Sequence, residues 1–403
     1  MTGRGRISPV AGDSLLPDEE RMMLERARAL IPRVAERASA AAAARQLPAE
    51  TIDEYRAAGI LRILQPRRFG GMQGRFSLFS RIVEELTYGC ASSAWVYAVL
   101  AEHQWIIAQY PEEAQIDVWG EDPEAVASSS LAPREAARRV PGGWRLSGRY
   151  PFSSGCDYAQ WAIIGTFLGE KGDPRHIAYL LVPLAEVEIV DDWQVLGLLG
   201  TGSKSLILRD VFVPEHRSVM VSDLFAGTPP GALVHPDYPV LRAPRGFLVS
   251  YSLPPVVIAL GRRALEIACA ALATRVSRGV TKVAESEVVQ MAIGEAAAAI
   301  DVATLLLHTG RESSTCRGQL GPQDHRGRGI TRPPRHGLCA ASGGLGARPP
   351  VRIGRRPLGL RQRSARGDPP RRDDNPDPTT PRAAKPRWPL TANAARPRRR
   401  VSP

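Results

Sequence analysis

The chain of 403 residues lacks the features typical of a membrane protein, a secreted disulfide-rich domain or a zinc protein. No uninterrupted apolar run approaches the ~18 to 20 residues that span a bilayer, and residues 1–17 contain no apolar signal segment. The five cysteines form neither a Cys-x-x-Cys pair nor a cluster with the spacing of metal ligands. We therefore expect a cytoplasmic protein without a membrane segment, a metal site or a disulfide framework.

Nucleotide-binding fingerprints are also absent. Gly197, Gly200 and Gly202 do not have the order of a dinucleotide-binding loop, and no Gly-Lys-Ser or Gly-Lys-Thr ending marks a P-loop. We interpret these glycines as positions where the backbone approaches a ligand closely, with the hydroxyls of Thr201 and Ser203 beside them. The chain is therefore not expected to bind NAD(P)H itself.

Positive charge is concentrated in one segment. The whole chain carries a formal charge of +12, but residues 309–403 hold 22 Lys and Arg against 6 Asp and Glu. This surplus of 16 leaves residues 1–308 with a formal charge of −4. Surfaces that bind single-stranded nucleic acid interleave aromatic and basic side chains, and the basic segment offers only Trp388. We therefore expect no nucleic-acid partner.

The basic segment has an unusual composition. It contains 21 Arg, one Lys and 15 Pro, and it shows neither helical nor strand periodicity. One interpretation is a natural disordered tail. The other is an out-of-frame reading of a GC-rich gene, in which shifted codons encode mainly Arg, Pro, Gly and Ala. We favour the frameshift, because the change falls abruptly at the end of an amphipathic helical pattern over residues 282–307.

The rest of the chain divides into three parts by its hydrophobic periodicity. Residues 17–122 have apolar positions at helical spacing, and residues 92–109 are apolar almost all round, which predicts a buried central helix. Residues 123–235 contain short alternating runs separated by turn residues, as in a β domain. Residues 243–308 return to two long helical patterns. These patterns predict an α+β fold of three successive domains.

Three local strings stand out in this order of domains: WRLSGRYPFSSG (144–155), GLLGTGSK (197–204) with VFVP (211–214), and AW (94–95) with EHQW (102–105). The first two resemble the β-domain signatures of the acyl-CoA dehydrogenase superfamily, in which the first passes the flavin ring. The third resembles one branch of it, the two-component flavin monooxygenases that hydroxylate hydroxyphenylacetate and steroid phenols.

This resemblance implies an acyl-CoA dehydrogenase-like architecture. An N-terminal helical domain (17–122) is followed by a middle β-barrel domain (123–235) and by the first two helices of a C-terminal bundle (243–308). A disordered or out-of-frame tail (309–403) then follows. Two departures stand out: Leu199 occupies a position that is commonly Arg in the family, and no residue after 308 matches the second half of the bundle.

The resemblance also implies a function. The chain is expected to be the oxygenase component of a flavin-dependent monooxygenase, which hydroxylates an aromatic or polycyclic substrate with reduced FMN or FAD and O2. A separate flavin reductase would supply the reduced flavin, and the intact family fold would form a homotetramer. One alternative is an acyl-CoA dehydrogenase that oxidises a thioester with FAD. Another is a truncated relic without activity.

His103, Ser153 and Ser154 are the candidate catalytic residues. An oxygenase must shield its reactive flavin adduct from water and donate a hydrogen bond near flavin N5, for which hydroxyls on a rigid turn are suited. An imidazole near a phenol can accept its proton and make the ring a better nucleophile. Two plainer interpretations stay open, namely that the serines only form the turn and that His103 is a core residue bonded to a backbone carbonyl.

The expected cofactor contacts come from the two β-domain strings, from the serines at 129 and 130, and from the first long helix of the bundle. Arg262 and Arg263 could meet a flavin phosphate as charged donors, although adjacent arginines on an amphipathic helix are commonly a solvated face. The full set of expected flavin-binding residues is Ser129, Ser130, Ser153, Ser154, Gly202, Ser203, Arg262 and Arg263.

Overall fold

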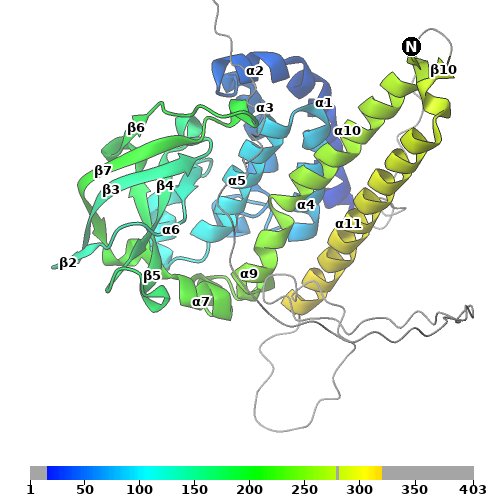
Figure 1. The fold of residues 1–403 in the computed structure, drawn as a ribbon. Coiled ribbons are helices and arrows are strands. Elements are labelled where there is room, and N and C mark those ends of the chain that lie inside the picture. The colour runs from blue at the N-terminus through cyan, green and yellow to red at the C-terminus, as the bar shows by residue number, and fades with distance from the viewer. Residues whose placement is uncertain (1–15, 278–280, 320–403) are drawn as a thin grey trace, which may run out of the picture. The chain divides into compact units, whose positions relative to one another are not determined.

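A computed structural model describes residues 16–277 and 281–319, and Figure 1 shows their helices and strands. Residues 1–15, 278–280 and 320–403 lie outside the described part, and with them most of the predicted tail. The last helix, α11 (Glu287–Gln319), runs past residue 308, where we placed the end of the helical pattern. The sequence has no proline after this point before Pro322, so nothing in that stretch removes a helical hydrogen bond.

The N-terminal part is helical, as its periodicity predicted. Helix α5 (Ala91–Ile107) lies at its centre, between α4 (Phe76–Gly89) and the β domain (Figure 1). Most of its residues are buried, because apolar side chains surround the helix on every side. The other helices of this part are α1 (Asp18–Glu36), α2 (Ala38–Ala44), α3 (Ala49–Ala57) and α6 (Glu112–Trp119).

Two four-stranded sheets form the middle domain and enclose its core. In one sheet the strand order is β1-β4-β5-β8, with β1 parallel to β4, and in the other it is β2-β3-β7-β6, with antiparallel pairing throughout. Leu146, Ile164 and Leu206 are among the apolar side chains that pack between the sheets. The strands are β1 (Ala127–Ser130), β2 (Arg138–Val140), β3 (Gly143–Ser153), β4 (Trp161–Phe167), β5 (Ile177–Pro183), β6 (Glu188–Val190), β7 (Lys204–Pro214) and β8 (Ser218–Met220).

The outer face of the first sheet packs against the helical domain. Ile163, Tyr179 and Leu181 alternate with the residues that face the core between the sheets, and they belong to the same hydrophobic cluster as α5. Side chains on one strand alternate between faces, so β4 and β5 serve both cores. This packing places α5 along β1, and the candidate site lies at that contact.

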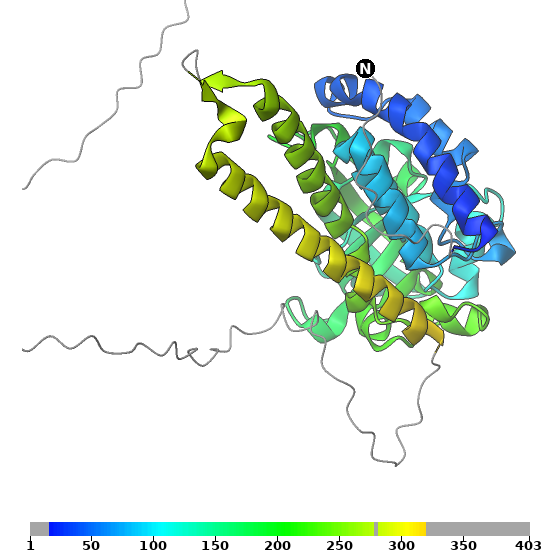
Figure 2. The same ribbon diagram turned by 90° about the vertical axis from the view of Figure 1, so that its right-hand side faces the viewer.

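Short elements connect the β domain to a pair of long helices, α10 (Pro254–Thr274) and α11, which lie side by side (Figure 2). Helix α10 packs on α4, and α11 packs on α10 and α4. The connecting elements are α7 (Val221–Ala226), α8 (Gly231–Val234) and α9 (Arg245–Leu248), and the short strands β9 (Val276–Ser277) and β10 (Thr281–Lys282) lie between α10 and α11.

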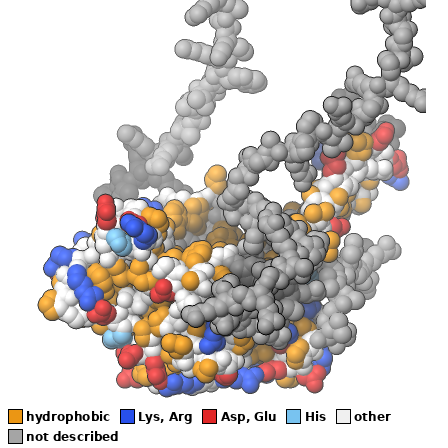
Figure 3. All heavy atoms as spheres, turned by 90° about the horizontal axis from the view of Figure 1, so that it is seen from below, with side chains coloured by type: hydrophobic (Ala, Val, Ile, Leu, Met, Phe, Trp, Pro, Cys, Tyr) orange, Lys and Arg blue, Asp and Glu red, His pale blue; other side chains and the backbone are white. Residues whose placement is uncertain are grey.

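Much of the apolar surface of this helix pair is exposed. Figure 3 shows apolar side chains among charged ones at its surface. Within α11, residues Glu287–Thr309 are long and apolar enough to cross a membrane by length and composition alone. The stretch is not an uninterrupted apolar run in the sequence, because Glu295 and Asp301 lie within it. The exposed large apolar residues of the pair are Val257, Leu260, Ile267, Val288, Met291, Val302, Leu305 and Leu306.

Candidate active site between helix α5 and the β domain

His103 of α5 and Ser129 of β1 form a hydrogen-bonded pair. The Nδ1 atom of His103 lies 2.6 Å from the carbonyl oxygen of Ala127, and its Nε2 atom lies 3.0 Å from Ser129 Oγ. A carbonyl can only accept, so Nδ1 carries the hydrogen of a neutral imidazole and Nε2 accepts from the serine hydroxyl. The predicted contact of His103 with a backbone carbonyl is therefore present, and it leaves the second nitrogen available as an acceptor.

The environment of His103 keeps its imidazole neutral. The residue is 3% exposed. Burial lowers the pKa of His103 to about 4, the hydrogen bond to Ala127 opposes this change, and the positive charge of Arg245 lowers the pKa further. At neutral pH the site therefore contains a buried, uncharged proton acceptor.

Strand β1 presents its serines to both of its faces. Ser129 faces α5, whereas the Ser130 hydroxyl donates to the carbonyl oxygen of Pro151 at 2.7 Å. Pro151 belongs to β3, two residues before the first of the two candidate serines. Ser129 and Ser130, both expected at the flavin, thus lie on opposite sides of β1: one meets His103 and the other ties β1 to the segment 151–155.

A directed chain of hydroxyls surrounds Ser154. The indole Nε1 of Trp95 donates to Ser154 Oγ at 3.2 Å, Ser154 and Ser203 share a hydrogen bond of 2.6 Å, and Ser203 lies 2.8 Å from Thr201 Oγ1. Thr201 donates its proton to the carbonyl of Leu198. Each hydrogen bond therefore points in the same direction, from the Trp95 donor to the Leu198 acceptor, and Ser154 donates its hydroxyl hydrogen to Ser203.

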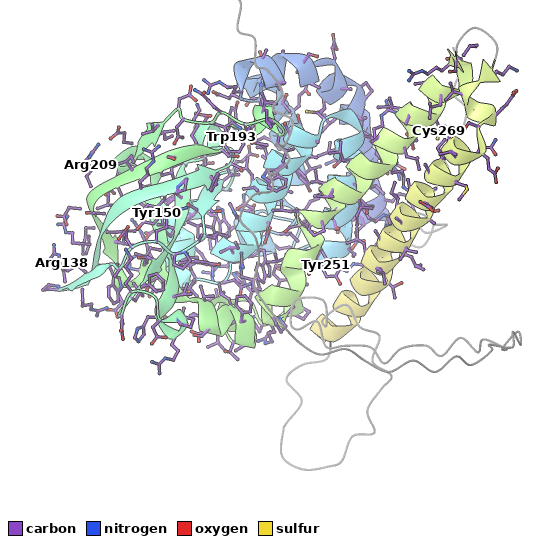
Figure 4. All side chains as sticks on the ribbon, viewed as in Figure 1. Arg138, Tyr150, Trp193, Arg209, Tyr251 and Cys269 are labelled. Carbon is purple, nitrogen blue, oxygen red and sulfur yellow. The ribbon has the colours of Figure 1, made fainter. Side chains whose placement is uncertain are left out.

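Ser153 differs from its neighbour. Its side chain is fully buried, and its hydroxyl has no hydrogen-bond partner among the described residues. The preceding residue, Phe152, has a φ of 65° and is 66% exposed, and its ring meets Trp193 edge-on with 6.3 Å between centroids. Figure 4 labels Trp193 at the end of the β domain nearest the helices. The strand is irregular here, because its pairing with β7 shifts register between Tyr150 and Ser153.

Two glycines allow the turns of the backbone around the serine cluster of Ser153, Ser154 and Ser203. Gly155 has a φ of 70°, and a side chain there would lie 3.0 Å from Val96 of α5. Gly202 has a φ of 53°, and a side chain would lie 3.2 Å from the Asp157 carboxylate. Both positions combine a left-handed backbone with a close neighbour, which explains why glycine occupies them. Gly202 lies between Thr201 and Ser203 of the hydroxyl chain, and its contact with flavin stays a prediction.

Lys204 and Asp157 form a largely buried ion pair that the sequence did not reveal. Lys204 Nζ donates to Asp157 Oδ1 at 2.7 Å and to the side-chain oxygen of Gln46 at 3.2 Å. The second carboxylate oxygen of Asp157 is buried without a partner among the described residues. Lys204 follows Ser203 directly, so its bond to Gln46 joins the hydroxyl chain to the helical domain.

The structure places Arg262 and Arg263 on α10, where Arg262 contacts α11 and Arg263 contacts a residue of its own helix. Arg262 donates to Asp301 at 3.2 Å and to Thr304 at 2.9 Å, both on α11, and Arg263 donates to Glu266 at 3.4 Å. No hydrogen bond or ion pair within the described residues joins either arginine to the serine cluster. Their contact with a flavin phosphate stays a prediction.

Three comparisons with known proteins support the predicted family. Residues 17–122 match the family described as acyl-CoA dehydrogenase, N-terminal domain. The chain is 38% identical, over 270 residues and 66% of each chain, to the oxygenase component of FADH(2)-dependent resorcinol hydroxylase from Rhizobium sp. (strain MTP-10005). It is 36% identical over 276 residues to the flavin-dependent monooxygenase oxygenase subunit HsaA from Mycobacterium tuberculosis, covering 68% of this chain and 70% of the relative.

Solved structures agree with these sequence matches. The crystal structure of the HsaA monooxygenase from M. tuberculosis superposes with a TM-score of 0.70 at 32% identity, over 75% of this chain and 78% of that one. Fold and site thus define a flavoprotein of acyl-CoA dehydrogenase type. Within that class, the chain belongs to the family of oxygenase components of two-component flavin-dependent monooxygenases, as its sequence strings predicted.

Proposed function

We propose that the chain hydroxylates a phenolic substrate with O2 and with reduced FMN or FAD that a separate flavin reductase supplies. The observation that carries this proposal is the buried, neutral pair of His103 and Ser129 beside the serine-rich β domain. A phenol hydroxyl is a suitable ligand for such a pair, because it can donate to the imidazole and accept from the serine. The relative that hydroxylates resorcinol, a phenol, supports this assignment.

His103 acts as a hydrogen-bond acceptor before it acts as a base. A phenol has a pKa near ~10, far above the pKa of about 4 for His103, so the bound substrate stays protonated in the resting complex. As the ring acts as a nucleophile, its hydroxyl becomes more acidic, and Nε2 of His103 receives the proton. The phenolic oxygen would take the place of Ser129 Oγ at Nε2, and the freed serine hydroxyl would then donate to it.

The serine cluster fits an isoalloxazine ring. Leaving a buried hydroxyl such as that of Ser153 unpaired costs about 1 to 3 kcal/mol, which a polar atom of a bound ring would recover. When bound, reduced flavin supplies the activation of O2. Ser153 and Ser154 hold the polar edge of the ring, and Gly202 and Ser203 line its approach. The ion pair of Lys204 keeps these residues in place.

The assembly and location follow from the same assignment. For the family fold with a complete bundle we propose a homotetramer, in which the exposed apolar side chains of α10 and α11 contribute to interfaces. We propose a cytoplasmic location, where a reductase can deliver flavin by diffusion. Arg262 and Arg263 remain candidate phosphate contacts in that assembly.

The test is a pair of conservative substitutions, His103→Gln and Ser129→Ala, assayed at saturating reduced flavin. We expect His103→Gln to lower the rate of phenol hydroxylation by about 10²- to 10⁴-fold, the usual contribution of a general base, while flavin binding stays within twofold. His235→Gln is the matched control, because this second buried histidine bonds to Gln115 away from the site. An unchanged hydroxylation rate in His103→Gln would show that His103 has a structural role only.

A further inference from the structure

Gln104, the residue after His103 on α5, holds the chain just before β1. Its side chain is fully buried. The Nε2 atom of Gln104 donates to the carbonyl oxygen of Ala125 at 3.2 Å, and its Oε1 atom accepts from the indole nitrogen of Trp119 at 3.1 Å. The same indole nitrogen lies 3.3 Å from the Ala125 carbonyl oxygen. Gln104, Trp119 of α6 and Ala125 thus form a closed set of three hydrogen bonds, which the proposed reaction does not use.

The next residue along the chain is held by the segment that leads into β4. The backbone nitrogen of Val126 donates to the side-chain oxygen of Gln160 at 3.1 Å, and its carbonyl accepts from the backbone nitrogens of Gln160 and Trp161 at 3.0 and 3.3 Å. Ala127 then begins β1, and its carbonyl accepts from His103 at 2.6 Å. Three consecutive residues are therefore each bonded to α5 or to the start of β4, which leaves the Ala127 carbonyl little freedom to move.

The position of this carbonyl determines which nitrogen of His103 carries the hydrogen. A neutral imidazole has two tautomers, and the hydrogen bond made by one nitrogen selects between them. With the Ala127 carbonyl at Nδ1, the Nε2 atom is left as an acceptor. If the carbonyl moved away, the imidazole could carry its hydrogen on Nε2 and donate to Ser129 Oγ, because a hydroxyl can accept as well as donate. A phenol would then meet a donor where the proposed reaction needs an acceptor.

We propose that Gln104 is a positioning residue for hydroxylation: by joining Ala125 to Trp119, it keeps the Ala127 carbonyl at Nδ1 of His103 and leaves Nε2 able to accept the phenol proton. This inference rests on the proposed function. The position needs a donor for a carbonyl and an acceptor for an indole N–H at the same time, and a glutamine amide supplies both. Methionine has a similar length but no donor, so Gln104→Met fills the space and removes the bond to Ala125.

The experiment determines the tautomer of His103 by nitrogen-15 NMR of the full chain at neutral pH without flavin. The signals of His103 are identified by their loss in His103→Gln. We expect the wild type to have a protonated Nδ1 and an unprotonated Nε2, and Gln104→Met to show the two signals shifted toward each other because both tautomers are populated. At saturating reduced flavin, kcat for phenol hydroxylation should fall by roughly 10-fold, less than on removal of the base itself, while flavin affinity stays within about twofold.

Gln115→Met is the matched control. Gln115 is also a fully buried glutamine, and its Nε2 atom donates to the carbonyl oxygens of Ala108 and Tyr110, which follow α5. Its replacement removes buried hydrogen bonds of the same kind and should lower stability, yet the His103 signals and kcat should stay as in the wild type. A structural role of buried glutamines in general would not distinguish the two variants.

A second variant covers the case in which Gln104→Met folds poorly. Trp119→Phe keeps an aromatic ring but removes the indole donor, so it should shift the His103 signals in the same direction. Unchanged signals in both variants, an equal shift in Gln115→Met, or a shifted tautomer with unchanged kcat would overturn the inference. The expected tautomer shift in a chain whose wild type hydroxylates no phenol would instead refute the proposed function.

Discussion

The buried imidazole of His103 should make the folded protein less stable in acid. Its pKa is about 4 in the fold, against an ordinary value of 6.5 that applies to the unfolded chain. Between these two pH values the unfolded state binds the proton and the folded state does not, so the contribution is complete above pH ~6.5 and disappears as the pH falls toward ~4. The difference corresponds to roughly 3 kcal/mol of unfolding free energy.

Urea unfolding of wild type and His103→Gln between pH 7.5 and pH 4 measures this contribution. Glutamine can replace both hydrogen bonds of the imidazole but does not titrate, so the variant should lose stability more slowly on acidification. The slopes should differ by up to about 1.4 kcal/mol per pH unit inside the window. His176→Gln, which removes an exposed imidazole, should parallel the wild type. Parallel curves for wild type and His103→Gln would refute the neutral-acceptor argument.

Three further outcomes are expected. Ser154→Ala should cost about 2 kcal/mol in urea unfolding, because it breaks the bonds to Trp95 and Ser203. Ser153→Ala removes a buried hydroxyl that has no partner among the described residues, so it should not lower stability, yet it should weaken flavin binding in a fluorescence titration. Lys204→Met should cost about 3 kcal/mol, seen as a lower Tm, because the Asp157 carboxylate loses its counter-charge. The purified chain should bind a hydrophobic dye and bind flavin weakly, since no described residue covers the exposed side chains of α10 and α11; a stable tetramer with submicromolar flavin affinity would contradict this.

The succession of helical, β and helical parts was predictable because hydrophobic periodicity changes sharply along the chain. The same reasoning predicted that α5 is buried, since its apolar residues lie on all sides. The end of the last helix was not predictable. Arginine, glutamate and serine are compatible with helix, so α11 continues to Gln319 although no apolar stripe in the sequence predicts this extension. The frameshift hypothesis concerns mainly residues outside the described part and stays a prediction.

The candidate site was only partly predictable. Local strings pointed to His103, Ser153 and Ser154 one by one, but the bond between His103 and Ser129 depends on how β1 packs against α5. The sequence around either residue does not predict that packing. The ion pair of Lys204 could not be predicted for the same reason, because its partner Asp157 lies on another segment of the β domain. Long-range pairs of this kind depend on tertiary structure, and a single sequence carries no signal of them.

The two neighbouring serines of β1 limit which sequence changes around this strand can be tolerated. Ser129 and Ser130 are fixed to one short strand that is hydrogen-bonded along its length to β4, and they reach opposite faces of it. The strand therefore keeps a constant spacing between His103 on one side and the segment 151–155 on the other. Substitutions on α5 can change the surroundings of His103 while this spacing stays the same, whereas a single inserted residue in β1 would exchange the two faces and break both contacts at once.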